Sequence, residues 1–172
     1  MIIRCLSTLR DRETAYVSVN GETCWTKTGI RAATGTQKCG GFFKEESFRV
    51  TGCYVTLTET LTDTVPLAVR VWTDLDGAAN DESFAIDNVA IKRAQQPVNG
   101  GTNNKFDNQH NFEGWNCGEI RPCGKFGNVC GGYDTKAKGH DITKTFDVPA
   151  GNYSVKLDFV KIDSWFVQEF IC

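Results

Sequence analysis

The sequence has no long apolar run, little charge bias and almost no helical periodicity. No apolar stretch approaches the ~20 residues that a transmembrane helix needs, so we expect no membrane insertion. Lysine and arginine total 19, and aspartate and glutamate total 21. This balance predicts neither a nucleic-acid partner nor an anionic membrane as a partner.

The motifs that assemble catalytic centres are also missing. There is no Gly-x-Ser-x-Gly elbow, no His-Glu-x-x-His and no glycine-rich phosphate loop before a helix. The two histidines, His110 and His140, lie in polar stretches and are expected on the surface. Glu82 and Asp87 could flank a glycosidic bond, but any acidic loop offers such a pair. We therefore expect a protein that is not an enzyme, and a glycoside-active enzyme is the least favoured alternative.

What the sequence does have is alternation of apolar and polar residues, which is typical of strands. Ala15, Val17 and Val19 alternate with more polar neighbours, and Asn20-Gly21 then favours a tight hairpin turn. Further strands are expected over 48–57, 67–73, 141–148 and 153–162. Pro149-Ala150-Gly151-Asn152 predicts a second hairpin between the last two. Strands spaced in this way predict an antiparallel β-sandwich, interrupted by a polar, glycine-containing linker over 94–105.

Eight cysteines in so short a chain indicate an oxidising compartment, so we expect an extracellular or cell-surface protein with disulfides. A zinc site is disfavoured because the sequence has no Cys-x-x-Cys knuckle. Eight cysteines allow 105 full pairings, and the sequence does not choose among them. The disulfide candidates are Cys5, Cys24, Cys39, Cys53, Cys117, Cys123, Cys130 and Cys172.

An acidic loop separates two of the expected strands. It carries five carboxylates within fourteen residues, which is costly unless the groups are solvated or neutralised by a cation. Loop oxygens of this kind are calcium ligands, although the flanking strands exclude an EF-hand. The alternative is a solvated turn in which Asp and Asn side chains cap backbone amides. The candidate metal ligands are Asp74, Asp76, Asp81, Glu82, Asp87 and Asn88.

Two further residues are candidates for contact with sugars. Trp115 lies in a stretch rich in Gly and Asn and could stack on a sugar ring if it is exposed, although sandwich tryptophans more often fill the core. Asn152-Tyr153-Ser154 is an N-glycosylation sequon in an expected turn, which fits secretion.

Two segments carry a family resemblance. The run 81–91 and the segment Lys161-Ile162-Asp163-Ser164-Trp165 resemble the jelly-roll, lectin-like modules of cysteine-rich surface proteins of ciliates and other protists. The resemblance implies one disulfide-stapled jelly-roll β-sandwich over residues 1–172. In the family, the Ile-Asp-Ser-Trp segment opens the module and the Asp-Glu-Ser segment closes it. Here 11–93 resembles the closing half and 106–165 the opening half.

Three explanations fit this inverted order: a circular permutation, a window cut out of phase from a tandem array, or subunits that exchange halves. A half-sandwich has exposed edges, so each half needs a complement in its own chain or in a neighbour. Exchange between neighbours is head-to-tail, and a head-to-tail contact that does not close makes a fibre. Cys5 and Cys172 could then bond within one chain or link neighbouring chains.

We therefore expect a non-enzymatic extracellular structural protein that is a subunit of a surface filament or tandem array. Copies of the chain would assemble with one another through head-to-tail β-strand exchange. Calcium is the candidate cofactor. The alternative is a carbohydrate-binding, lectin-like module for adhesion, whose partners are glycans.

Overall fold

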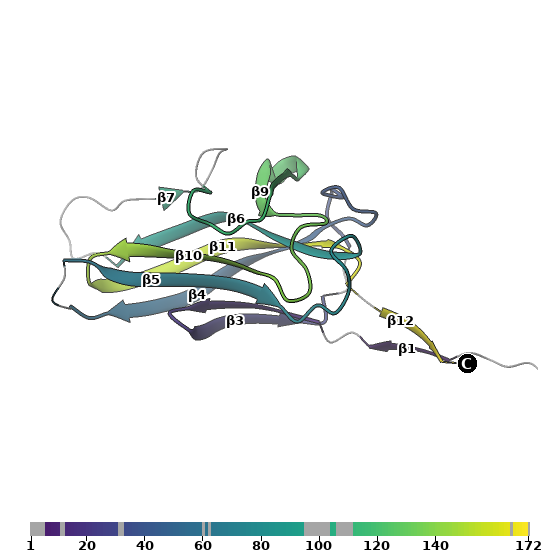
Figure 1. Cartoon of the computed structure of the whole chain (residues 1–172), viewed down its shortest axis with the longest axis horizontal. Coiled ribbons are helices and arrows are strands. Elements are labelled where there is room, and N and C mark those ends of the chain that lie inside the picture. Colours follow the sequence, from purple (N-terminus) through teal and green to yellow (C-terminus); the bar gives the residue numbers. More distant parts are fainter. Residues whose placement is uncertain are drawn as a thin grey trace, which may run out of the picture.

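The chain folds into a β-sandwich of two antiparallel sheets (Figure 1). The computed structural model describes residues 6–10, 13–30, 33–59, 61, 63–94, 104–105, 112–165 and 167–171. Within these ranges the only helical element is the short 3-10 turn η1, Gly124–Phe126. The expected all-β, antiparallel architecture is confirmed. The same ranges contain no helix long and apolar enough to cross a membrane.

A four-stranded sheet has the order β10-β5-β2-β3. Its strands are β2 Thr14–Val19, β3 Glu22–Thr28, β5 Val65–Thr73 and β10 Asp141–Val148. A six-stranded sheet has the order β4-β11-β6-β9-β8, with β7 paired to β6. Its strands are β4 Glu46–Leu57, β6 Glu82–Arg93, β7 Asn104–Lys105, β8 Ile120–Pro122, β9 Asn128–Gly131 and β11 Gly151–Asp163.

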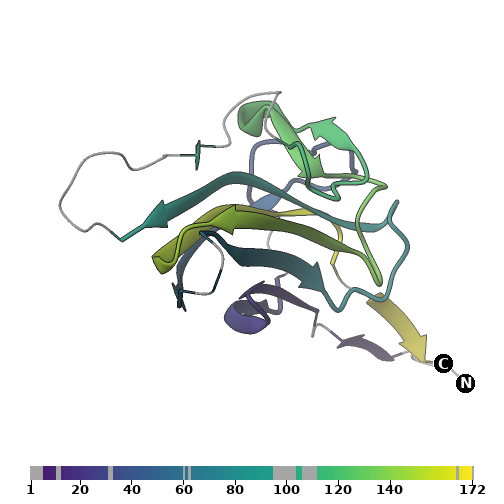
Figure 2. The same cartoon turned by 60° about the vertical axis from the view of Figure 1, so that its left-hand side comes forward.

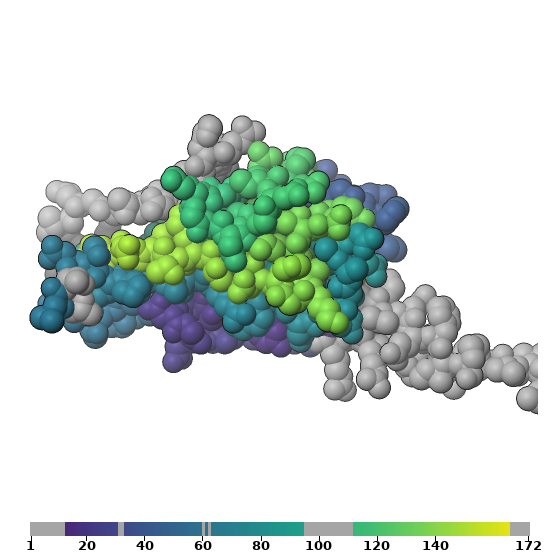
Figure 3. Space-filling model, viewed as in Figure 1, coloured from purple at the N-terminus to yellow at the C-terminus, as the bar shows by residue number. Residues whose placement is uncertain are grey.

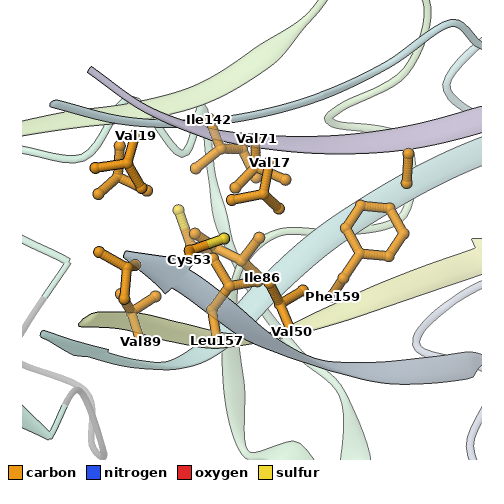
Figure 4. Close-up of a cluster of buried hydrophobic side chains, with 14 of the residues drawn as sticks. Val17, Val19, Val50, Cys53, Val71, Ile86, Val89, Ile142, Leu157 and Phe159 are labelled. Atoms are coloured by element: carbon orange, nitrogen blue, oxygen red, sulfur yellow. The ribbon is translucent and has the colours of Figure 1, made fainter. Parts of the chain in front are cut away.

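The core lies between the two sheets, where alternate residues of each strand point inward. In β5 the buried side chains are every second residue from Val65 to Thr73, as the sequence alternation predicts. Figure 4 shows Val17, Val71 and Ile142 from the four-stranded sheet facing Ile86 and Leu157 from the other. The sandwich is therefore closed by apolar contacts within one chain.

The predicted hairpin at Asn20-Gly21 is confirmed. β2 and β3 pair antiparallel, and the two turn residues have φ angles of 49° and 83°. A two-residue turn with positive φ at both positions matches the right-handed twist of the strands it joins, which is why Asn-Gly is favoured there.

The second predicted hairpin, between 141–148 and 153–162, is wrong. β10 pairs with β5 in the four-stranded sheet, whereas β11 pairs with β4 and β6 in the other sheet. The chain crosses from one sheet to the other at Pro149 and Ala150. Pro and Gly at this position encode a bend, but a bend does not specify which strand the next segment pairs with.

The two sequence ranges that resemble module halves are interleaved in space. β10 and β11, from the second range, pair with β5, β4 and β6 from the first. Each range thus finds complementary strands in its own chain. Most of the expected linker over 94–105 lies outside the described residues, apart from residue 94 and β7, which pairs with Ala90 and Ile91.

The described residues form three disulfides, so the expected stapling is confirmed. They join Cys24 to Cys53, Cys39 to Cys123, and Cys117 to Cys130. The Cys24–Cys53 bond links β3 to β4, which are the edge strands of different sheets. It therefore holds the two sheets together along one open side. The remaining candidates, Cys5 and Cys172, lie outside the described residues.

The segment that contains β8, η1 and β9 lies along the other side of the sandwich. In the space-filling view this green segment covers the flank next to β10 (Figure 3). Asn116, just before it, donates its backbone N–H to the Thr143 carbonyl at 3.2 Å, and its side-chain oxygen accepts the Thr143 N–H. The loop therefore satisfies part of the backbone hydrogen-bonding groups on the outer edge of β10. This limits pairing of that edge with a strand of another molecule.

A separate two-stranded ribbon projects from one end of the sandwich. β1 Leu6–Arg10 and β12 Val167–Ile171 pair antiparallel, with Leu6 opposite Ile171 and Arg10 opposite Val167. Figures 1 and 2 show the ribbon extending away from both sheets. The first and last described strands thus leave the sandwich side by side.

Candidate metal centre

Three carboxylates meet at the end of the sandwich from which the ribbon projects. They belong to Glu13, immediately before β2, to Asp76 in the loop after β5, and to Glu82, the first residue of β6. One carboxylate oxygen from each lies within 4.8 Å of the others. Glu13 and Glu82 are buried, with 8% and 1% of their surfaces exposed, while Asp76 is exposed. We call these three residues the acidic triad.

The loop backbone holds Glu82 in place. The Gly77 N–H donates to Glu82 Oε2 at 2.7 Å. A Cβ at position 77 would lie 2.6 Å from the same oxygen, so a larger residue there would require the Glu82 carboxylate to shift. Gly77 and Glu82 therefore shape one side of the triad together.

Burial and mutual repulsion raise the pKa values of the two buried acids. The pKa of Glu13 is raised to about 8, first by desolvation and then by the charges of Glu82, Asp76 and Asp74. The pKa of Glu82 is also raised, mainly by desolvation. Near neutral pH the triad must therefore hold a proton or a cation.

A calcium ion fits the donor set of the triad. Ca²⁺ binds oxygen ligands at about 2.3–2.6 Å, so oxygens up to about 5 Å apart can share one ion. The separations within the triad satisfy this condition. Glu13, Asp76 and Glu82 would hold the ion, with its other ligands drawn from backbone carbonyls or water.

Asp74 and Asp81 flank the triad but are bound to other groups. The Asp74 carboxylate accepts the backbone N–H of Thr14 and, at 3.2 Å, the hydroxyl of Tyr16. The Asp81 carboxylate accepts the Ser164 hydroxyl at 2.8 Å. Both carboxylates therefore connect this loop to distant segments, Asp74 to the start of β2 and Asp81 to Ser164 after β11.

Asp87 and Asn88 lie elsewhere on the sandwich. They are five and six residues along β6 from Glu82, which corresponds to roughly 16–20 Å of extended strand. The Asn88 amide donates to Asp87 at 3.1 Å and to Asp158 at 2.8 Å. Asp158 also pairs with Arg49 at 2.9 Å. The structure therefore divides the six predicted ligands between two separate clusters.

Glu13 was not among the predicted ligands, although the sequence contains a sign of it. It continues the inward-facing series of Ala15, Val17 and Val19 by one position, so its side chain points toward the core side of the sheet. A carboxylate at an inward position needs a partner. Because Glu13 is 63 residues from Asp76, no local motif connects the two.

The two candidates for sugar contact occupy different environments. Trp115 is 8% exposed and packs edge-to-face with Phe146, with ring centroids 5.9 Å apart. The core therefore covers the ring face that was expected to stack on a sugar. Asn152, the acceptor of the sequon, is exposed near the start of β11. Its side-chain oxygen accepts the Thr56 hydroxyl at 2.8 Å.

The two segments that carry the family resemblance are neighbours in the sheet. Ile162 pairs with Ser83, and Asp163 with Glu82. The buried Trp165 indole donates to the Ser83 carbonyl at 2.9 Å. Although the segments are almost 80 residues apart in the sequence, they therefore form one continuous structure beside the acidic triad.

Comparisons with known proteins found no relative. No family model matches the sequence, no curated protein matches it, and no solved structure matches the fold.

Proposed function

We propose that this protein is a non-enzymatic extracellular structural subunit that assembles head-to-tail through its terminal ribbon. The observation that carries the proposal is the β1–β12 pair, which stands apart from both sheets. An isolated two-stranded ribbon is marginally stable in water, and each of its strands has an outer edge able to pair with another chain.

Strand exchange requires only that the β1–β12 pairing form between two copies of the chain instead of within one copy. β12 of one copy would pair with β1 of the next, keeping the register in which Leu6 lies opposite Ile171. Such a contact joins different surfaces of the two copies, and repetition gives an open chain where successive contacts do not close. A jelly-roll sandwich that is complete within one chain would then be the repeating body of a filament.

The disulfides support an oxidising location, and with it the extracellular part of the proposal. Cys5 precedes β1 in the sequence and Cys172 follows β12. In a strand-exchanged filament these two cysteines would link neighbouring copies. Non-reducing electrophoresis is then expected to show a ladder that collapses on reduction, and a monomer band that reductant leaves unchanged contradicts the covalent link.

Calcium is the cofactor that we propose for the acidic triad. The support is the closeness of three carboxylates, two of them buried. The buried Lys161 lies close enough for Glu13 to influence its pKa, but burial lowers that pKa. A bound divalent cation would neutralise the triad and fix the loop after β5 at the end of the sandwich that bears the ribbon.

Electron microscopy of the purified chain tests the assembly. We expect filaments whose length grows with protein concentration, and single particles from a variant that lacks residues 1–10. The melting temperature of the truncated variant should stay within a few degrees of that of the full chain, because the sandwich does not include β1. Dispersed particles from the full chain at every concentration, or filaments from the truncated variant, would contradict the proposal.

A further inference from the structure

A groove of about 340 Å³ lies on the outer face of the six-stranded sheet. Strands β4 and β11 form most of its wall, and Ala94, just after β6, completes it. The volume falls within the range of ligand sites in proteins. The residues that line the groove are uncharged, and several carry hydroxyl or amide groups. This wall therefore suits a neutral ligand that is rich in hydroxyl groups.

The sequon Asn152-Tyr153-Ser154 runs along one wall of this groove. Alternation along β11 turns Tyr153 toward the core, where it is 6% exposed and donates its hydroxyl to the Pro149 carbonyl at 2.7 Å. Asn152 and Ser154 therefore both face outward. The strand thus holds the sequon in one orientation, with the acceptor side chain at the surface.

The Asn152 amide contains the atom that carries an N-linked glycan. Its Oδ1 accepts the Thr56 hydroxyl at 2.8 Å, across the β4–β11 pair. This bond uses the amide oxygen, whereas an N-linked glycan is attached through the amide nitrogen. The backbone is also fixed, because the Asn152 carbonyl accepts the Ala94 N–H at 2.7 Å. A sugar on Asn152 would therefore start from a defined position beside the groove.

An exposed aromatic ring lies next to this position. Tyr54 is opposite Ser154 in the register, so it is the diagonal neighbour of Asn152 across the two strands. Diagonal neighbours are about 7–8 Å apart, which is within reach of an aromatic side chain. Tyr54 is 74% exposed and lines the groove. Its ring is a flat apolar surface that ends in a hydroxyl, and such a surface can pack against the face of a sugar ring.

We propose that Asn152 carries an N-linked glycan and that the first N-acetylglucosamine of this glycan packs on Tyr54 in the groove. The inference rests on the extracellular part of the proposed function, because N-glycans are attached in the secretory pathway. The groove would then be occupied by a sugar that is covalently bound to its own wall.

The attachment needs a sugar donor, which the secretory pathway supplies as an oligosaccharide linked to a lipid pyrophosphate. The Nδ2 atom of Asn152 forms a bond to C1 of the first N-acetylglucosamine, and the bond from C1 to the pyrophosphate oxygen breaks. The lipid pyrophosphate leaves with that electron pair, and the amide nitrogen loses one proton. The Ser154 hydroxyl completes the sequence that the transferring enzyme recognises.

Secretion of the full chain from a eukaryotic host, behind a heterologous leader, tests the attachment. Intact-mass spectrometry is expected to show a single glycan that peptide-N-glycosidase removes. N152Q and S154A should both lack the glycan, although S154A retains the acceptor asparagine. A full chain without a glycan, or a glycan that persists in N152Q, would overturn the proposal.

The packing on Tyr54 is tested on protein that an endoglycosidase has trimmed to one N-acetylglucosamine. We compare it with the same chain secreted in the presence of an inhibitor of N-glycosylation. The trimmed protein should melt about 2–4 °C higher, the shift that one aromatic contact gives in a protein of this size. Y54T should abolish this difference. In NMR spectra the Tyr54 ring should shift the acetyl protons of the sugar upfield, and Y54T should remove that shift.

The matched control is F42T, because Phe42 is similarly exposed, at 75%, but does not line the groove. F42T should leave the effect of the sugar on the melting temperature unchanged. Equal melting temperatures with and without the sugar, or an acetyl signal that Y54T does not alter, would overturn the packing on Tyr54. Filaments from a chain without a glycan would overturn this inference alone. A glycan packed on Tyr54 in a chain that never forms filaments would contradict the proposed assembly alone.

Discussion

At the scale of single residues, Asp163 shows how a buried carboxylate fixes a loop that is far away in the sequence. It is 1% exposed and accepts the backbone N–H groups of Phe42 at 2.9 Å, Phe43 at 3.2 Å and Ser164 at 3.0 Å. A Cβ on Gly41 would lie 2.8 Å from the same carboxylate. The loop that presents Phe42 to solvent is thus held by charge-assisted hydrogen bonds.

The substitution Asp163→Asn is expected to destabilise the protein by about 1–3 kcal/mol, because an amide N–H₂ replaces one of the accepting oxygens. Asn tolerates the φ of 64° at this position, so the backbone should not change. Urea unfolding measures the loss. Asp134→Asn is the control, since Asp134 also has a positive φ but is exposed. Equal losses of unfolding free energy for the two substitutions would show that the buried hydrogen bonds of Asp163 do not contribute to stability.

Glu13 makes stability depend on pH in a direction that can be worked out. In the folded protein its pKa is about 8, compared with an ordinary value of 4.5. Between these two pH values the folded state holds more protons than the unfolded chain, so the free energy of unfolding falls as pH rises. In calcium-free buffer we expect the melting temperature to decrease from pH 5 to pH 8.5, and Glu13→Gln to flatten this decrease. A profile that is the same in both proteins would argue against the raised pKa.

At the scale of strands, the Cys24–Cys53 bond connects the open edges of the two sheets. It closes a loop of 29 residues. In the chain-entropy description, removing such a cross-link costs about 3–4 kcal/mol, mainly through the greater freedom of the unfolded chain. The double substitution C24A/C53A should therefore lower the free energy of unfolding by that amount in denaturant titrations. C117A/C130A opens a loop of only 13 residues and should cost slightly less. The reverse order would show that native-state packing, not loop length, controls the effect.

Strands and tight turns could be predicted from the sequence because their causes are local. The alternation in β5 and the Asn20-Gly21 turn depend on neighbouring residues alone. The partner of β10 could not be predicted, because pairing with β5 depends on contacts about 70 residues away. Two of the three residues of the acidic triad were predicted for the same reason: Asp76 and Glu82 are six residues apart in the sequence, whereas Glu13 reaches them only through the β2–β5 pairing.

At the scale of the whole molecule, calcium is expected to raise the stability of the fold. A ligand that binds only the folded state adds about 2.7 kcal/mol at one hundred times its dissociation constant. For a protein of this size, that corresponds to a rise of roughly 5–10 °C in melting temperature. Calorimetry with added Ca²⁺ and after chelation measures the difference. The charge-removing variant E13Q/E82Q should melt at the same temperature in both conditions. An unchanged melting temperature of the natural sequence after chelation would exclude a stabilising calcium ion.

The adjacency of β1 and β12 has a practical consequence for the whole molecule. Because Leu6 lies opposite Ile171, the first and last strands that the structure describes lie side by side. Paired residues on neighbouring antiparallel strands are only about 5 Å apart, a gap that the two cut ends of a surface loop can span. Insertion of a complete domain is best tolerated at exposed loops of this kind. We therefore expect that this sandwich can be inserted into a surface loop of a carrier protein. Both junctions would lie in that one loop, so the carrier's own fold should be preserved.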